Sequence, residues 1–196
     1  MFTRAAQAVA ALDSSKQQQQ QDNSLCSALQ QQPLVTSQFT LEVASSSSND
    51  SSQQSTHKYL IAQGCAGLGT PAWELAKQVS HQLGTTLVPW AAVAFPLLDS
   101  SNSGPVAMEN GSLFCFLPLP ASSGLPIHIN GTFEVASNRR DLWHGADLLG
   151  LGKQRASWNA VLLSDIAAPL YATLLAAAAA KLGPSDGFYK IGRAHV

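Results

Sequence analysis

The chain is poor in charged residues and in long apolar runs. Charged residues are 12% of its 196 residues, about half of the usual share, and the formal net charge at pH 7 is −1. A balance this close to neutral excludes nucleic-acid binding by bulk electrostatic attraction, so we expect no nucleic-acid partner. No apolar run approaches the ~20 residues that cross a bilayer, and Leu170–Ala180 is too short. We therefore expect no membrane partner.

Cysteine is scarce as well, and Cys26, Cys65 and Cys115 follow no paired spacing. An odd number of scattered cysteines excludes a disulfide framework and is typical of a reducing compartment, so we expect a cytoplasmic protein. Scattered cysteines and histidines also make no recognisable zinc site, and we expect no metal. We interpret the cysteines as small buried hydrophobic residues.

Phosphate-binding signatures are missing too. Gln63–Thr70, QGCAGLGT, is glycine-rich and precedes a helix, but its spacing matches neither the Rossmann nor the Walker pattern. We interpret it as a loose turn, and we expect no cofactor in this chain.

Low-complexity segments divide the chain. Residues 1–37 are rich in Gln and Ser and lack apolar periodicity, which predicts disorder. Residues 38–190 are predicted to form one α+β domain, with a disordered Ser-rich insertion at 44–57. Residues 191–196, IGRAHV, match a sequencing adapter read in frame, so we expect that tail to be an artefact and the chain to be a fragment. Met1 is then the start of a partial gene model; the alternative is the start of a transit peptide.

Periodicity predicts the elements of this domain. Alternating or continuous apolar residues predict strands at Phe39–Val43, Lys58–Ala62 and Trp90–Leu98, the last ending near Pro96. Helical spacing predicts helices at 71–83 and 158–181. With the strands of the segment described below, these make a mixed sheet of about five or six strands covered by helices.

The two helices carry different signals. The first has Thr70 as N-cap, Pro71 at its first position and Gly84 as C-cap. In the second, a face made by Trp158, Leu162, Ile166 and Tyr171 is expected around a break near Pro169, and Ala176–Ala180 is expected to extend into solvent or toward a missing neighbour.

The most informative stretch is 111–145, GSLFCFLPLPASSGLPIHINGTFEVASNRRDLWHG. Phe114–Leu117 predicts a buried strand stopped by Pro118 and Pro120. A turn at 124–126 follows, and then Ile127–Ile129 alternates like a half-buried strand. Asn130-Gly131 predicts a type I′ hairpin turn with Thr132–Val135 as the returning strand. A polar loop, 137–143, then carries Arg139 and Arg140.

Three linked segments of this stretch resemble the repeat unit of the sacsin family of co-chaperone-like proteins. FCFLPLP, GLPxHxNG and SNRRDxW stand in the family's order, and the resemblance covers roughly residues 39–190. The resemblance marks as motif residues Phe114, Phe116, Pro118, Gly124, Pro126, His128, Asn130, Gly131, Asn138, Asp141 and Trp143.

The resemblance also implies a function for the adjacent arginines. Sacsin repeats resemble GHKL ATPases, in whose chaperone members an arginine after the nucleotide pocket reaches toward the γ-phosphate. By that analogy Arg139 or Arg140 senses nucleotide, and ATP belongs to a preceding domain, because the pocket signatures are absent here. The structural alternative pairs these arginines with Asp141 or Glu134, or stacks them on Trp143.

Three functions follow as hypotheses. The first is a non-catalytic segment of a sacsin-like chaperone, which couples an adjacent ATP-binding domain to client proteins or neighbouring repeats. The second is a stand-alone protein-interaction module without nucleotide dependence. The third is a hydrolase using Cys115 with His128, for which the sequence supplies no activating partner. A lone His128 on a strand is more often a hydrogen-bonded structural residue than a catalyst.

Overall fold

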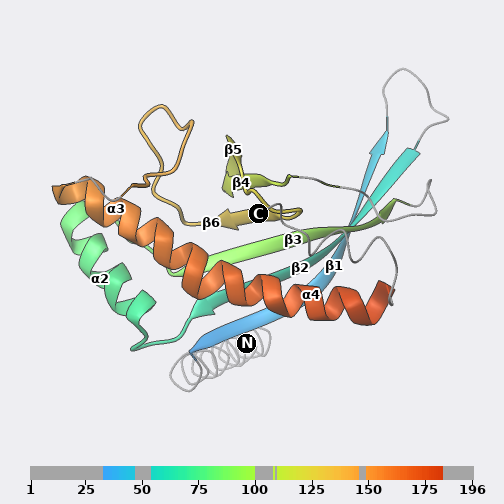
Figure 1. Ribbon diagram of the computed structural model, residues 1–196, viewed down its shortest axis with the longest axis horizontal. Helices are drawn as coiled ribbons and strands as arrows, with labels where there is room; N and C mark the ends of the chain where they lie inside the picture. The colour runs from blue at the N-terminus through green and yellow to red at the C-terminus, as the bar shows by residue number, and fades with distance from the viewer. Residues whose placement is uncertain (1–32, 47–53, 100–107, 109, 146–148, 183–196) are drawn as a thin grey trace, which may run out of the picture.

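Six strands form one sheet in the computed structural model, which describes residues 33–46, 54–99, 108, 110–145 and 149–182 (Figure 1). The strand order is β1-β2-β3-β6-β4-β5. Every neighbouring pair is antiparallel except β4 and β6, which run parallel. The bounds are β1 Leu34–Ser46, β2 Gln54–Ala66, β3 Trp90–Asp99, β4 Ser112–Cys115, β5 Leu117–Ser122 and β6 His128–Gly131. With its helices, this mixed sheet confirms the predicted α+β class.

The first hairpin is longer than the sequence predicted. β1 and β2 pair residue by residue from Leu34↔Ala66 to Ser46↔Gln54, so both predicted strands lie inside longer ones. The expected insertion at 44–57 is correspondingly shorter, and β1 begins within the segment expected to be disordered up to residue 37. Pairing with a neighbour extends a strand through Ser-rich sequence that carries little strand preference of its own. Residues 1–32, 47–53 and 191–196 lie outside the described residues.

β3 continues through Pro96 to Asp99 instead of ending near the proline. Its second neighbour, β6, pairs only with Ala91–Ala94, so Pro96 lies where one described strand, β2, flanks it. The register of the β2–β3 pair shifts near this proline, between His57 and Tyr59 of β2. Proline is tolerated in a strand at such an edge, because no ladder hydrogen bond needs its missing N–H.

The predicted buried strand over Phe114–Leu117 is wrong. β4 ends at Cys115, the chain turns at Phe116 with a φ of 59°, and β5 starts at Leu117. Phe116 and Leu117 are 70% and 63% exposed. The prolines of the motif do not stop a strand; Pro118 lies inside β5, which is the edge strand of the sheet and therefore loses no ladder bond to it.

The predicted hairpin turn at Asn130-Gly131 is also wrong. Both residues belong to β6, the φ of Gly131 is not positive, and Gly131 pairs with Ala91 of β3. The expected return strand does not pair with β6; within it, only Val135 makes a bridge, to Leu142. The reason is tertiary: β3 and β4 flank β6 on both sides, and their pairing overrides the local turn preference.

Helix α2 (Pro71–Leu83) has the predicted bounds and caps. The Thr70 hydroxyl accepts a hydrogen bond from the Trp73 N–H at 3.3 Å, and Gly84 ends the helix with a φ of 65°. Ala72, Ala76 and Val79 are buried along one face, as the helical spacing predicted.

A second, continuous helical run crosses the sheet: α3 (Gly150–Val161), a π-helical turn η1 (Leu162–Ala167) and α4 (Ala168–Leu182) (Figure 1). It begins well before the predicted start at Trp158, and it does not break at Pro169. The Ala168 N–H donates to the Leu163 carbonyl, five residues back, so the wider π turn accommodates the proline that follows.

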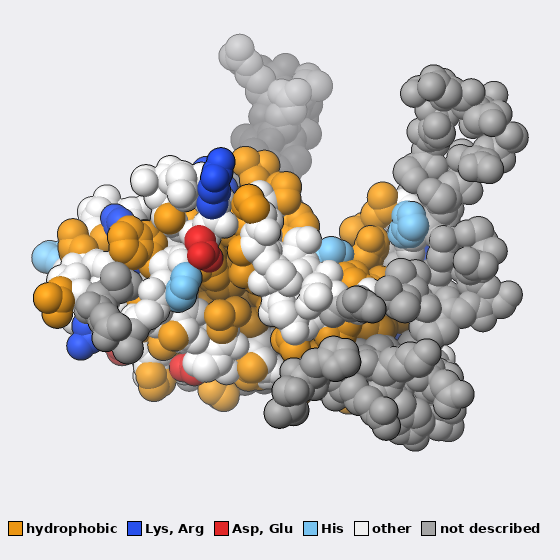
Figure 2. All heavy atoms as spheres, turned by 45° about the horizontal axis from the view of Figure 1, so that its top comes forward, with side chains coloured by type: hydrophobic (Ala, Val, Ile, Leu, Met, Phe, Trp, Pro, Cys, Tyr) orange, Lys and Arg blue, Asp and Glu red, His pale blue; other side chains and the backbone are white. Residues whose placement is uncertain are grey.

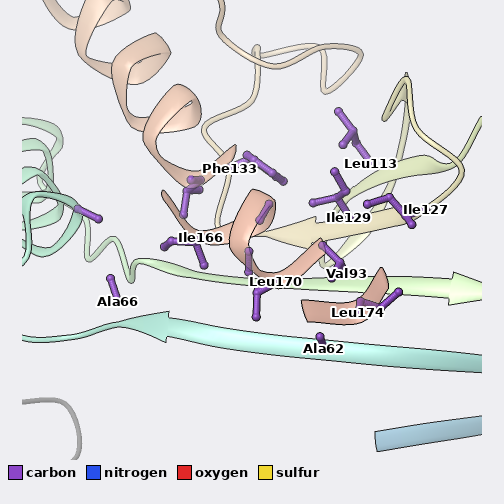
Figure 3. Close-up of a cluster of buried hydrophobic side chains, with 14 of the residues drawn as sticks. Ala62, Ala66, Val93, Leu113, Ile127, Ile129, Phe133, Ile166, Leu170 and Leu174 are labelled. Atoms are coloured by element: carbon purple, nitrogen blue, oxygen red, sulfur yellow. The ribbon is translucent and has the colours of Figure 1, made fainter. Parts of the chain in front are cut away.

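The buried face of this run forms the core. Its fully buried side chains recur every four residues, at Trp158, Leu162, Ile166, Leu170, Leu174 and Ala178. Figure 3 shows Ile166, Leu170 and Leu174 beside Val93 and Ala62 of the sheet. The π turn keeps this four-residue spacing on one face, so Leu170 is buried where Tyr171 was predicted, and Tyr171 is half-buried. Ala178 packs on the core, so the alanine run does not simply extend into solvent.

By length and composition alone, the helical run from Gly150 to Lys181 could cross a membrane. The apolar stretch Leu170–Ala180, expected to be too short to cross a bilayer, lies inside a continuous helical run of 32 residues. One such helix is weak evidence, since the core helix of a soluble protein passes the same test. Here one face of the run packs against β2 and β3.

Candidate functional site

The three motif segments converge at one end of the sheet. The Phe116 N–H donates to the Asn130 Oδ1 at 3.0 Å, which joins the first segment to the second. The Arg139 Nη2 donates to the Cys115 carbonyl at 3.4 Å, which joins the first to the third. We call these four residues, Cys115, Phe116, Asn130 and Arg139, the motif junction.

Two residues of the motif junction have a left-handed backbone. Phe116 and Arg139, with φ values of 59° and 52°, are the two non-glycine residues with positive φ in the described part of the chain. Such a conformation costs about 1–2 kcal/mol per residue, so surrounding contacts must hold it. For Phe116, these are the bond to Asn130 and a parallel stack on the Trp90 ring, with centroids 6.3 Å apart. Strain at exposed residues is typical of functional sites.

A small hairpin presents the two arginines. Val135 and Leu142 form its bridge, and the Ala136 N–H donates to the Asp141 carbonyl at 2.9 Å. At its tip the Asn138 Oδ1 accepts from the Arg140 N–H at 3.0 Å, and the Arg139 N–H donates to the Ala136 carbonyl at 2.8 Å. The side-chain acceptor of Asn138 fixes the turn, which explains an asparagine there. Both arginine side chains are exposed.

Asn159 of α3 anchors this hairpin from below. It is 3% exposed, its Nδ2 donates to the carbonyls of Glu134 at 2.7 Å and Trp143 at 2.9 Å, and its Oδ1 accepts from the Glu134 N–H at 2.8 Å. The neighbouring Trp158 Nε1 donates to the Thr132 carbonyl at 2.8 Å. The core helix therefore holds both ends of the segment that carries the arginines.

A different arginine occupies the partners expected for Arg139 and Arg140. The Arg155 Nε lies 3.3 Å from the Glu134 Oε2, and the Arg155 guanidinium lies over the Trp143 ring, 5.5 Å from its centroid. The His144 Nδ1 lies 3.9 Å from the Asp141 Oδ1. Neither Arg139 nor Arg140 forms an ion pair within 4.0 Å in the described ranges, so the predicted pairing with Asp141 or Glu134 is not found there. The structural contact of Arg139 is its hydrogen bond to the Cys115 carbonyl.

Charged side chains lie close together on the hairpin, where Arg139, Arg140 and Asp141 are consecutive and exposed. Figure 2 shows basic, acidic and histidine side chains close together near the centre of the described surface, among hydrophobic and uncharged ones. The exposed Arg140 guanidinium, which has no hydrogen bond or ion pair among the described residues, keeps its donors for a phosphate or a carboxylate.

His128 is a structural residue in this geometry. Its Nδ1 accepts from the Ser112 N–H at 3.1 Å, which places the proton of the neutral ring on Nε2. The rings of Phe114 and Tyr59 lie 5.7 Å and 6.1 Å away, centroid to centroid. Burial among these groups lowers the pKa of His128, which keeps the imidazole neutral as the Ser112 contact requires.

Cys115 is not placed for nucleophilic catalysis. Its Sγ donates to the Phe133 carbonyl at 3.3 Å, and no hydrogen bond joins it to His128 among the described residues. Burial raises the pKa of the thiol, although the nearby Arg139 charge partly opposes this. A raised pKa disfavours the thiolate that a nucleophile requires, so the hydrolase hypothesis finds no support. Within the same described ranges, no three Cys, His, Asp or Glu side chains cluster as metal ligands would.

The remaining motif residues shape turns. Gly124 has a φ of 68° with open space around it, in the predicted turn, and Pro126 is half-buried beside it. The Trp143 Nε1 donates to the Val135 carbonyl at 3.2 Å, which braces the arginine hairpin. The Asp141 Oδ1 accepts from the Leu142 N–H at 2.8 Å.

Sequence reasoning missed Arg155 and Gly111. Arg155 lies four residues before Asn159, and this polar i, i+4 pair on the helix that carries Trp158 was the available signal. A Cβ at Gly111 would lie 1.8 Å from the Ile127 carbonyl oxygen, so only glycine fits there. No sequence pattern pointed to that contact, because it joins segments that become neighbours in the fold.

Comparison with known proteins gives the site its context. The fold and the site define an α+β domain whose mixed sheet carries a hairpin with two exposed arginines. Over 62 residues, 32% of this chain, the sequence is 45% identical to sacsin of Homo sapiens. The chain therefore contains a sacsin-related region. The match covers 1% of the length of that relative. No family model matches the chain, and no solved structure matches it.

Proposed function

We propose that the chain is a non-catalytic segment of a sacsin-like molecular chaperone and couples an adjacent ATP-binding domain to client proteins or neighbouring repeats. The observation that supports this most is the exposure of Arg139 and Arg140, neither of which forms an ion pair among the described residues. Glu134 and Trp143, two of the partners expected for them, contact Arg155 instead. Arg140, and the donors of Arg139 that the Cys115 carbonyl does not take, are candidates for a contact outside the fold.

The chemistry of the arginine hairpin suits a phosphate group. A guanidinium presents planar, paired donors that bind phosphate oxygens bidentately, and two in succession on a tight turn can bracket an anion. The hairpin backbone is fixed at its base by Asn159 and at its tip by Asn138, so little backbone freedom would be lost on binding. The γ-phosphate of ATP in a preceding domain is the proposed target.

The anchoring by Asn159 also supplies a route for coupling. A displacement of the hairpin would be transmitted to α3 through the hydrogen bonds of Asn159 and Trp158. Helix α3 continues through η1 into α4. The π turn is a natural place for such a helix to adjust, because its hydrogen bonds already depart from the α pattern. Client proteins or neighbouring repeats would sense the position of the helical run.

Sequencing the full-length transcript across both ends of this chain tests the proposal. An upstream domain with a GHKL nucleotide pocket is expected. Its absence would contradict the coupling role and would favour a stand-alone interaction module, for which the exposed Phe116 and Leu117 are the specific observation.

A further inference from the structure

The two edges of the sheet are protected to different degrees. β5, at one edge, has six residues and contains Pro118 and Pro120, which cannot donate to an added strand. β1, at the other edge, has 13 residues and contains neither proline nor glycine (Figure 1). It pairs with β2 without a bulge along its whole length. Proteins usually blunt an edge strand with proline, lysine, a bulge or short length, and β1 has none of these.

The side chains of β1 also suit pairing. Phe39, Leu41 and Val43 alternate on the face opposite the core helices and are 44%, 44% and 42% exposed. Glu42 is the single charged residue of the strand, and Lys58 of β2 already neutralises it at 2.8 Å. Among the described strands β1 pairs with β2 alone, so no described strand pairs with the N–H and C=O groups of its outer edge.

We propose that a second copy of this chain pairs with β1 in antiparallel register about a two-fold axis at Leu41. In this register Leu41 faces the partner's Leu41, and Phe39 faces the partner's Val43. Three apolar cross-strand pairs then form on the open face, where aromatic and branched side chains opposite one another stabilise a sheet.

Charge complementarity selects a second copy as the occupant. On the helix face, the Lys181 Nζ donates to the Thr40 Oγ1 at 3.1 Å. The register centred on Leu41 places the partner's Glu42 opposite Thr40, next to this ammonium group. The two-fold axis repeats the contact, so each Glu42 lies between Lys58 of its own chain and the Lys181 of the other, and no like charges face each other.

The mass of the full chain in solution, measured by analytical ultracentrifugation, tests the proposal. A dimer is expected, and Leu41→Lys is expected to raise its dissociation constant about tenfold or more, because it opposes two ammonium groups at the axis. Lys181→Glu should also weaken the dimer. Val88→Lys is the matched control, since Val88 is 43% exposed and lies outside β1. Unchanged circular dichroism shows that each variant remains folded.

Oxidative crosslinking tests the register independently of variant stability. Opposed antiparallel residues have Cα atoms about 4.5 or 5.5 Å apart, within the roughly 4.4–6.8 Å that a disulfide spans. Leu41→Cys should therefore form a covalent dimer, above the background of the unsubstituted chain, and Val43→Cys should not. A monomeric chain, a dimer insensitive to Leu41→Lys, or equal crosslinking by both cysteine variants would overturn the proposal.

Discussion

Replacing Asn159 with alanine should selectively loosen the arginine hairpin. The substitution removes three hydrogen bonds and leaves the Glu134 N–H, the Glu134 carbonyl and the Trp143 carbonyl without their partner. A net hydrogen bond contributes about 0.5–1.5 kcal/mol, and a buried group left unsatisfied costs about 1–3 kcal/mol. Water that enters the vacated space will offset part of this, so we expect a loss of about 2–4 kcal/mol in the free energy of unfolding.

Urea unfolding followed by circular dichroism and tryptophan fluorescence measures this loss. The midpoint should fall while the slope with denaturant stays unchanged, because the surface exposed on unfolding is nearly the same. Ser157→Ala, an exposed position on the same helix, is the control and should change stability by less than about 0.5 kcal/mol. Asn159→Asp keeps the acceptor but loses both donors, and should destabilise at neutral pH as well. A loss below about 0.5 kcal/mol for Asn159→Ala would refute the anchoring role.

Three further predictions concern the same region. Arg155→Ala should lower the free energy of unfolding by about 1–2 kcal/mol, through the lost ion pair and ring contact, whereas Arg139→Ala or Arg140→Ala should change it by less than about 0.5 kcal/mol. His128→Asn keeps an acceptor for the Ser112 N–H but removes the titrating group. The free energy of unfolding should therefore vary less with pH between the lowered pKa of folded His128 and about 6.5. Gly111→Ala should cost about 3 kcal/mol or more, because its Cβ would meet backbone.

The sign of the histidine effect follows from proton binding. The folded state has the lower pKa, so the unfolded state binds the proton more readily as the pH falls below about 6.5, and stability is lost in that direction. Unfolding midpoints measured from neutral to acidic pH show it, and an unaltered slope in His128→Asn would contradict it. For Gly111→Ala the comparison is Gly124→Ala, which lies in open space at positive φ and should cost only about 1 kcal/mol. Equal losses at the two glycines would exclude the predicted steric contact.

The sequence predicted correctly the helix whose ends are fixed by residues next to it in the chain. The bounds and caps of α2 were readable because Thr70, Pro71 and Gly84 act within one helical turn of their own positions. The Asn130-Gly131 hairpin failed because β3 and β4, distant in sequence, pair on both sides of β6. The partners of Arg139 and Arg140 were mistaken for a similar reason. Nearby carboxylates and Trp143 looked available, and the sequence did not reveal that Arg155, on a helix beyond the hairpin, would contact Glu134 and Trp143.

The proposed nucleotide contact is tested most directly by nucleotide-linked closure of the full-length protein, measured as the distance between labels on this segment and on the preceding domain. The account predicts that a non-hydrolysable ATP analogue shortens this distance in the unsubstituted protein. It predicts that Arg139→Ala or Arg140→Ala reduces the change while Ser157→Ala does not. The same closure in both arginine variants and in the unsubstituted protein, or no closure in any of them, would contradict it.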